Sequence, residues 1–224
     1  MHDLAILFDL DGTLADTLTD IAAAGNHALR TLGRPPLPVA RYRYLAGQGL
    51  PYLIEHALAA EGTSTPAQQE AGIAAFRTFY AQHKYDHTGP FVGLPAVLDE
   101  LTVRGVRLAV LSNKPHDATV AVVADLFGRW QWDAVAGAKP GVPLKPDAGA
   151  ALAIADELDI PAERWVYVGD TRVDMETGKA AGMYTIGVTW GFRDEAELRE
   201  HGADAIVHQP AELLAVVEQL NPAT

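Results

Sequence analysis

The sequence of 224 residues contains no cysteine. Without thiols there is no disulfide framework, no thiolate metal site and no cysteine nucleophile, which excludes zinc ribbons, iron–sulfur proteins and cysteine phosphatases. A chain without disulfides also favours a reducing compartment, so we expect a cytoplasmic protein.

Basic residues are scarce as well. Lysine and arginine number 17 against 29 aspartates and glutamates, which leaves a formal net charge of −12. No run of basic residues offsets this charge locally. Such a balance opposes binding to the phosphate backbone of nucleic acids, and we therefore expect no nucleic-acid partner.

Long hydrophobic runs are also missing. The first apolar stretch, residues 4–8, ends at Asp9, whereas a membrane span needs about 20 apolar residues. It is also too short for the hydrophobic region of a signal peptide, so we expect neither export nor a membrane partner. Hydrophobic residues still make up 49% of the chain and charged residues 21%, which predicts a globular protein with a real core.

Short apolar runs alternate with helical patterns along most of the chain. The runs at 4–8, 107–111 and 165–168 are each followed at once by a polar cluster, as is typical of buried strands that end at a site. Further strands are predicted at 132–136, 185–189 and 205–208, and helices at 94–104, 148–158, 195–200 and 211–220. This alternation predicts an α/β fold with a Rossmann-like parallel sheet and helices on both faces.

One segment, residues 17–87, interrupts the alternation. Apolar residues recur at helical spacing in three stretches of it, 21–32, 52–60 and 67–82. We interpret the segment as a small all-α cap domain inserted after the first strand, with residues 1–16 and 88–224 forming the α/β core. The chain returns to the core through 86–93, where glycine and proline predict a loop.

The polar clusters at the strand ends contain the residues suited to chemistry. In open α/β sheets, ligands bind at the carboxyl ends of the strands, so these clusters should share one cleft. The candidates are Asp9, Asp11, Thr13, Ser112, Asn113, Lys145, Asp170 and Asp174. Carboxylates at close range need a cation to stay ionised, and an all-oxygen donor set favours Mg²⁺ over Zn²⁺. Lysine, hydroxyl and amide donors beside that cation indicate a phosphoryl group.

Several of these candidates have a plainer interpretation. The alternatives are a turn for residues 9–13, a helix N-cap for Ser112-Asn113, and a cap of the following helix for Asp174. Lys139 competes with Lys145 as the phosphate ligand, because both lie in the same loop. We favour Lys145, which abuts the next predicted helix.

In their order along the chain, these motifs resemble those of the haloacid dehalogenase superfamily of phosphatases. The resemblance rests on Asp9-Leu10-Asp11-Gly12-Thr13-Leu14, then Ser112, then Lys145-Pro146-Asp147, and then Gly169-Asp170-Thr171 with Asp174. It implies that Asp9 attacks phosphorus and becomes an aspartyl phosphate. Asp11 would protonate the leaving alkoxide and then deprotonate the hydrolytic water. Alternation along an extended segment would put the side chains of Asp9 and Asp11 on the same side.

The resemblance also implies how the cation and the phosphate are bound. The ligands of Mg²⁺ would be the carboxylate of Asp9, the backbone carbonyl of Asp11 and the carboxylate of Asp170, with Asp174 orienting the metal's waters. The phosphoryl oxygens would be bound by Thr13, Ser112, the backbone of Asn113, and Lys145. Mg²⁺ is therefore the cofactor that we expect.

Two reactions of the superfamily are not expected here. Dehalogenases lack an acid two residues after the nucleophile, where this chain has Asp11. Phosphonate-cleaving relatives carry a Schiff-base lysine in the cap, whereas the only lysine of 17–87 is Lys84. The turn at 45–50 and the stretch 167–198 are similar to those of the phosphoglycolate phosphatases. This similarity implies a Mg²⁺-dependent phosphomonoester hydrolase of a small phosphorylated metabolite, as a monomer or a homodimer.

Other functions stay open at this point. A sugar-phosphate mutase or another sugar-phosphate phosphatase uses the same nucleophile and acid, and a non-enzymatic module would capture a phosphorylated ligand without turnover. In the cap, Arg41 and Arg43 are either a clamp for a substrate carboxylate or solvated helix charges.

Overall fold

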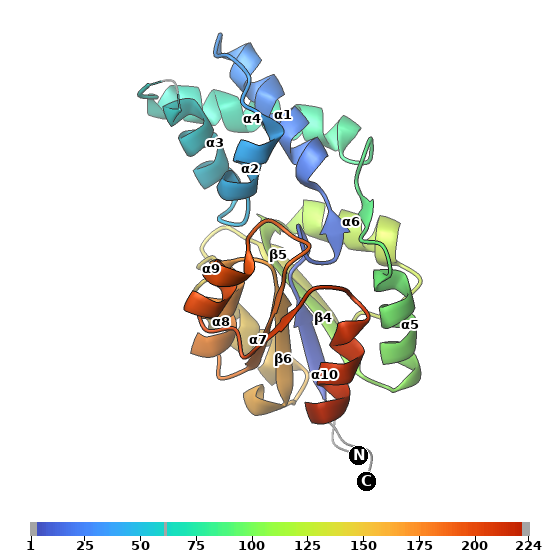
Figure 1. The fold of residues 1–224 in the computed structure, drawn as a ribbon. Helices are drawn as coiled ribbons and strands as arrows, with labels where there is room; N and C mark the ends of the chain where they lie inside the picture. Colours follow the sequence, from blue (N-terminus) through green and yellow to red (C-terminus); the bar gives the residue numbers. More distant parts are fainter. Residues whose placement is uncertain (1–3, 61, 221–224) are drawn as a thin grey trace.

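The computed structural model describes residues 4–60 and 62–220. They contain a six-stranded sheet of order β5-β4-β1-β6-β7-β8, in which neighbouring strands are parallel (Figure 1). The strands are β1 (Ala5–Phe8), β4 (Arg107–Pro115), β5 (Ala134–Ala138), β6 (Trp165–Gly169), β7 (Tyr184–Val188) and β8 (Ala205–Val207). Because β1 lies between β4 and β6, the loops that follow these three strands meet at one edge of the sheet.

Helices cover both faces of this sheet. They are α5 (Leu94–Val103), α6 (His116–Phe127), α7 (Gly149–Glu157), α8 (Arg172–Ala180), α9 (Glu195–Glu200) and α10 (Glu212–Leu220), with a 3₁₀ turn at Ala162–Arg164. Ile6 and Phe8 of β1 pack with α5, α6 and α10, whereas Ala5 and Leu7 pack with α7. Side chains alternate across a strand, so β1 is buried on both faces. The predicted α/β fold is confirmed.

The structure extends one predicted strand and adds one helix to the core. β4 continues to Pro115, past the predicted end at Leu111. The added helix, α6, places Thr119, Val122 and Phe127 on its buried face. Its valines and threonine have low helix propensity because they are β-branched, and they obscure the helical pattern in the sequence.

The described part of 17–87 contains four helices, which we call the cap. They are α1 (Leu18–Thr31), α2 (Val39–Leu45), α3 (Leu50–Ala59) and α4 (Pro66–His83). They pack around an apolar core of their own that includes Ile21, Leu29, Tyr42, Ile54 and Phe76, and Figure 1 shows them above one end of the sheet. The sequence pattern does not predict α2, which is too short, at 7 residues, to show a helical period. No helix in the described part of the chain combines the length and the hydropathy needed to span a bilayer.

The chain enters and leaves the cap through two short antiparallel strands, β2 (Ala15–Asp16) and β3 (Gly89–Pro90). β3 lies within the segment that the sequence predicts to be a loop. Beside it, Oδ2 of the buried Asp20 accepts hydrogen bonds from the N–H of His87 (3.0 Å) and from the N–H and hydroxyl of Thr88 (2.8 and 2.7 Å). Asp20 therefore ties the first turn of α1 to the returning chain.

Removing this carboxylate should destabilise the protein. We expect Asp20→Ala to lower the free energy of unfolding by about 3 kcal/mol, because the buried donors of Thr88 lose their acceptor. Urea unfolding followed by circular dichroism measures the change. Asp86→Ala is the matched control, since Asp86 is exposed and pairs with His83 at the surface. A loss in Asp20→Ala no larger than in this control would contradict the interpretation.

Candidate active site

The turn after β1 brings a carboxylate to the edge of the sheet. Asp9 is buried, and its N–H donates to the carbonyl of Val168 in β6 (2.9 Å). The chain then turns, with three successive N–H groups donating to the carbonyl of Leu10. Gly12 has a φ of +91°, and a Cβ there would lie 2.3 Å from Oδ2 of Asp170. Glycine therefore allows this turn to approach the loop after β6.

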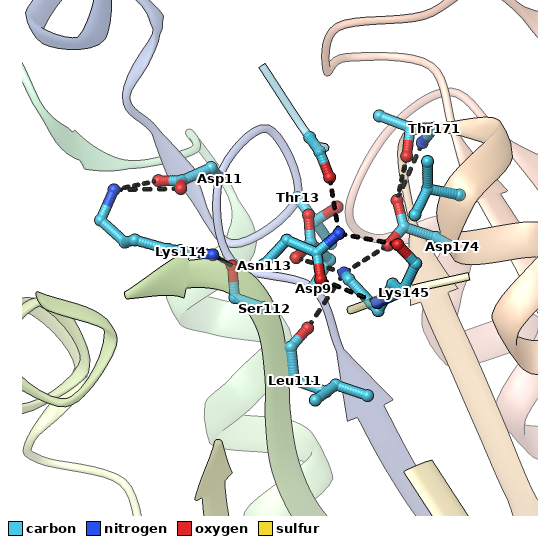
Figure 2. Close-up of polar contacts among 12 residues, drawn as sticks. Asp9, Asp11, Thr13, Leu111, Ser112, Asn113, Lys114, Lys145, Thr171 and Asp174 are labelled. Atoms are coloured by element: carbon cyan, nitrogen blue, oxygen red, sulfur yellow. Dashed lines mark hydrogen bonds and ion pairs between the residues drawn. The ribbon is translucent and has the colours of Figure 1, made fainter. Parts of the chain in front are cut away.

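Lys145 supplies the positive charge beside Asp9. As Figure 2 shows, its ammonium donates to Oδ1 of Asp9 (2.8 Å), Oδ1 of Asp174 (2.6 Å) and the carbonyl of Leu111 (3.1 Å). Burial by itself lowers the pKa of Lys145, but the carboxylates of Asp174 and Asp9 outweigh it and hold that pKa well above its ordinary value. Lys139, the competing lysine of the sequence, is exposed. The structure thus places Lys145 against the predicted nucleophile.

Asp170 accepts two hydrogen bonds, and Asp174 accepts two in addition to the one from Lys145. Asp170 accepts from the hydroxyl of Thr13 (3.0 Å) and the N–H of Phe192 (2.7 Å). Oδ2 of Asp174 accepts from the N–H and the hydroxyl of Thr171 (3.0 and 2.7 Å) in a capping box at the start of α8. Asp174 therefore caps the helix and also contacts the buried lysine. The hydroxyl of Thr13, predicted to bind phosphate, instead donates to Asp170.

Asp9, Asp170 and Asp174 form a cluster that fits a divalent cation. Each offers a carboxylate oxygen, and these oxygens lie within 4.8 Å of one another in a buried position. Burial raises the pKa of Asp9 to about 7, against the attraction of Lys145. Burial, together with the carboxylates of Asp174 and Asp9, also holds the pKa of Asp170 well above its ordinary value. A cation would keep both groups ionised, and the all-oxygen donor set suits Mg²⁺.

The end of β4 contributes Ser112 and Asn113, which are both buried. The N-cap interpretation of these residues is wrong, because α6 begins only at His116. Oδ1 of Asn113 accepts from the N–H of Lys145 (2.9 Å), and Nδ2 donates to the carbonyls of Lys145 (3.0 Å) and of Gly47 in the cap (3.0 Å). The Asn113 side chain therefore fixes the loop that carries Lys145 and joins it to the cap.

Asp11 points away from Asp9 (Figure 2). Both of its carboxylate oxygens accept from the ammonium of Lys114 (2.9 and 3.0 Å), which also donates to the hydroxyl of Tyr80 on α4 (2.9 Å). The expectation that Asp9 and Asp11 share one side is wrong, because residues 10–14 form a turn instead of an extended strand. Sequence reasoning assigns no role to Lys114, although it stands in the polar cluster after the second predicted strand.

A cleft of about 770 Å³ lies between these loops and the cap. Its walls include Asp9, Asp11 and Lys114 from the core and Leu53, Phe76 and Tyr80 from the cap. The turn at 45–50 borders it through Gly47 and Gly49. Arg43 instead donates to the carbonyls of Gly191 (2.6 Å) and Phe192 (3.1 Å). It joins the cap to the core, which is neither of the roles that the sequence left open.

The sequence pattern of haloacid dehalogenase-like hydrolases matches residues 6–188, and the chain belongs to this family of hydrolases. Its relatives include the phosphoglycolate phosphatase of Pseudomonas syringae pv. tomato, 30% identical over 97% of this chain and 78% of that protein. A phosphoglycolate phosphatase of Cupriavidus necator is 34% identical over 91% of this chain and 88% of its own length.

Solved structures show the same fold. A protein from Lactobacillus delbrueckii subsp. bulgaricus, described as a candidate phosphoglycolate phosphatase, matches with a TM-score of 0.89 and 32% identity, over 97% of this chain and 99% of that one. CbbY from Rhodobacter sphaeroides, solved in complex with phosphate, matches with a TM-score of 0.75 and 26% identity, over 94% and 96% of the two chains. The family predicted from the motifs is confirmed.

Neutralising Asp170 should change stability differently with and without Mg²⁺. In EDTA we expect Asp170→Asn to raise the melting temperature by roughly 2–4 °C, equivalent to about 1 kcal/mol at this chain length, because a buried carboxylate with repelling neighbours is removed. The stabilisation that Mg²⁺ confers on the wild type should disappear in the variant. Differential scanning calorimetry with and without Mg²⁺ measures both effects.

The control for this measurement is Asp204→Asn. Burial alone would raise the pKa of Asp204, but hydrogen bonds from Lys179 and Thr185 lower it, so this variant should melt at a lower temperature and keep the response to Mg²⁺. If Mg²⁺ stabilised Asp170→Asn as strongly as the wild type, the proposed metal site would be wrong.

Proposed function

We propose that this chain is a Mg²⁺-dependent phosphomonoester hydrolase of a small phosphorylated metabolite, with phosphoglycolate as the first candidate. The observation that carries the proposal is the buried contact of Asp9 with Lys145, next to the carboxylate of Asp170. It combines a nucleophile, a counter-charge and a cation site at one point. Relatives named phosphoglycolate phosphatase, at 30% and 34% identity, support the choice of substrate.

The first half of the proposed reaction forms a covalent bond to Asp9. A carboxylate oxygen of Asp9 attacks phosphorus while the P–O bond to the leaving alcohol breaks, which yields an aspartyl phosphate. Lys145, held in place by Asp174, offsets negative charge on the nucleophile and the phosphoryl group. When bound by Asp9, Asp170 and the backbone carbonyl of Asp11, Mg²⁺ would neutralise further charge on the phosphoryl group.

Asp11 is the proposed proton carrier. It gives its proton to the oxygen of the leaving alcohol in the first half of the reaction. In the second half it takes a proton from a water molecule, whose oxygen attacks phosphorus and breaks the bond to Asp9. Its carboxylate borders the cleft in which the leaving group must lie. Ser112 and the backbone N–H of Asn113 would bind phosphoryl oxygens.

The position of the cap and the cations in the cleft favour a small substrate with more than one negative group. It bounds the cleft from the side opposite Asp9, so its closure would exclude water and block a macromolecular phosphoester. Although the chain as a whole is acidic, Arg77, Lys84 and Lys139 also line the cleft. These cations would attract a molecule that carries a carboxylate besides its phosphate.

A phosphate-release screen over small phosphomonoesters tests the proposal. With Mg²⁺ we expect phosphoglycolate among the best substrates, and we expect EDTA to abolish turnover. Asp9→Asn should lower kcat by ~10³-fold or more, because the amide does not form the acyl phosphate. Asp156→Asn, which changes an exposed carboxylate of α7, is the matched control and should keep the wild-type kcat. Appreciable turnover in Asp9→Asn would rule out the covalent mechanism.

A further inference from the structure

Lys114 connects the core to the cap at the edge of the cleft. It lies near the end of β4, and its side chain is 6% exposed. Its ammonium contacts both carboxylate oxygens of Asp11 and the hydroxyl of Tyr80, and it lies 4.7 Å from the centre of the Tyr80 ring. The ring of Tyr80 in turn stacks on that of Phe76 within the cap (5.5 Å). Lys145 is the counter-charge of Asp9, whereas the charge of Lys114 lies against Asp11.

The contacts of Lys114 define the direction of the Asp11 side chain. An ammonium has three N–H donors, and here they account for two hydrogen bonds to Asp11 and one to Tyr80. Two hydrogen bonds to one cation orient both oxygens of the carboxylate, whose side chain is 13% exposed at the cleft. Because the remaining contact is to α4, the orientation of Asp11 depends on where the cap lies.

We propose that Lys114 is a positioning residue that holds Asp11 in place for proton transfer to the leaving group, and that Tyr80 ties this arrangement to the cap. The inference rests on the proposed function, because it takes Asp11 as the proton donor. It adds that the donor is in place only when α4 is seated on the core. Lys114 itself neither binds the phosphate nor gains or loses a proton in this scheme.

This inference can be tested with two phosphate esters whose leaving groups differ in their need for a proton. The alkoxide of ethyl phosphate needs protonation as its P–O bond breaks, whereas p-nitrophenolate leaves as a stable anion. Neither ester carries a carboxylate, so a direct contact between Lys114 and a substrate carboxylate does not affect the comparison. The ratio kcat/KM reports the steps up to release of the alcohol, and hydrolysis of the shared aspartyl phosphate affects only kcat.

Lys114→Met should lower kcat/KM selectively. We expect a loss of ~10²-fold for ethyl phosphate and of less than about threefold for p-nitrophenyl phosphate, since general acid catalysis is lost for the first ester alone. Lys114→Arg keeps a cation with several donors and should recover most of the ethyl phosphate activity. Lys179→Met is the matched control. Lys179 also pairs with a carboxylate, Asp204 (2.8 Å), but outside the cleft, so kcat/KM for both esters should stay at its wild-type value.

Tyr80→Phe keeps the inference testable where Lys114→Met fails to fold. It preserves the packing of the ring and removes only the hydroxyl. We expect the same selectivity with a smaller loss, roughly 3–10-fold for ethyl phosphate. Tyr85→Phe is the control, because the Tyr85 hydroxyl also bonds to a carboxylate, that of Asp125 on α6. Removal of this hydroxyl should leave kcat/KM unchanged for both esters.

Asp11→Asn distinguishes a failure of the positioning role of Lys114 from a failure of Asp11 as the proton donor. If it loses ethyl phosphate activity selectively while Lys114→Met and Tyr80→Phe do not, the positioning role of Lys114 is overturned and Asp11 keeps its role. Equal losses on both esters in Lys114→Met, or a loss confined to phosphoglycolate, would also overturn it. If Asp11→Asn shows no selectivity, the proton donor of the proposed function is wrong and the inference fails with it. A wild type that hydrolyses neither these esters nor phosphoglycolate contradicts the proposed function itself.

Discussion

One buried ammonium between two buried carboxylates is the contact on which the rest of the site depends. Lys145 lies 2.8 Å from Asp9 and 2.6 Å from Asp174, and removing one partner of such a pair costs about 3–5 kcal/mol because it leaves an uncompensated charge. One lysine does not balance three carboxylates, so burial and the neighbouring carboxylates together keep the pKa values of Asp9 and Asp170 raised. A divalent cation would correct this imbalance, so metal binding and stability should be linked.

The parallel sheet makes this contact possible by bringing distant parts of the chain to one edge. Asp9 follows β1, Asp170 follows β6, and Lys145 lies in the loop between β5 and α7. The cap reaches the same edge from the opposite side, where Gly47 contacts the end of β4 and Tyr80 contacts Lys114. The proposed nucleophile and the charges around it therefore belong to the core, while in our proposal the cap affects access to the cleft and the orientation of Asp11.

Local sequence patterns explain why much of the core fold and of the candidate site could be predicted. Apolar runs followed by carboxylates indicate strands that end at a site, which is how Asp9 could be placed, and the ordered motifs single out Lys145. The contacts of Lys114 could not be predicted, because it meets Asp11 across 103 positions and Tyr80 across 34. Such pairings depend on how α4 lies against the core. The direction of Asp11 follows from a turn whose hydrogen bonds converge on a single carbonyl, and alternation along a strand does not describe it.

The proposed phosphoryl transfer to Asp9 can be tested directly in a variant that should form the intermediate but hydrolyse it slowly. In the proposed mechanism Asp11→Asn lacks the group that activates water, and p-nitrophenyl phosphate needs no acid to react with the enzyme. After incubation with Mg²⁺ and this ester, the protein is quenched in acid, digested and analysed by mass spectrometry. We expect the peptide that contains Asp9 to gain the mass of one phosphoryl group. Release of p-nitrophenol without this gain, or a phosphoryl group on a different residue, would contradict the role of Asp9 as nucleophile.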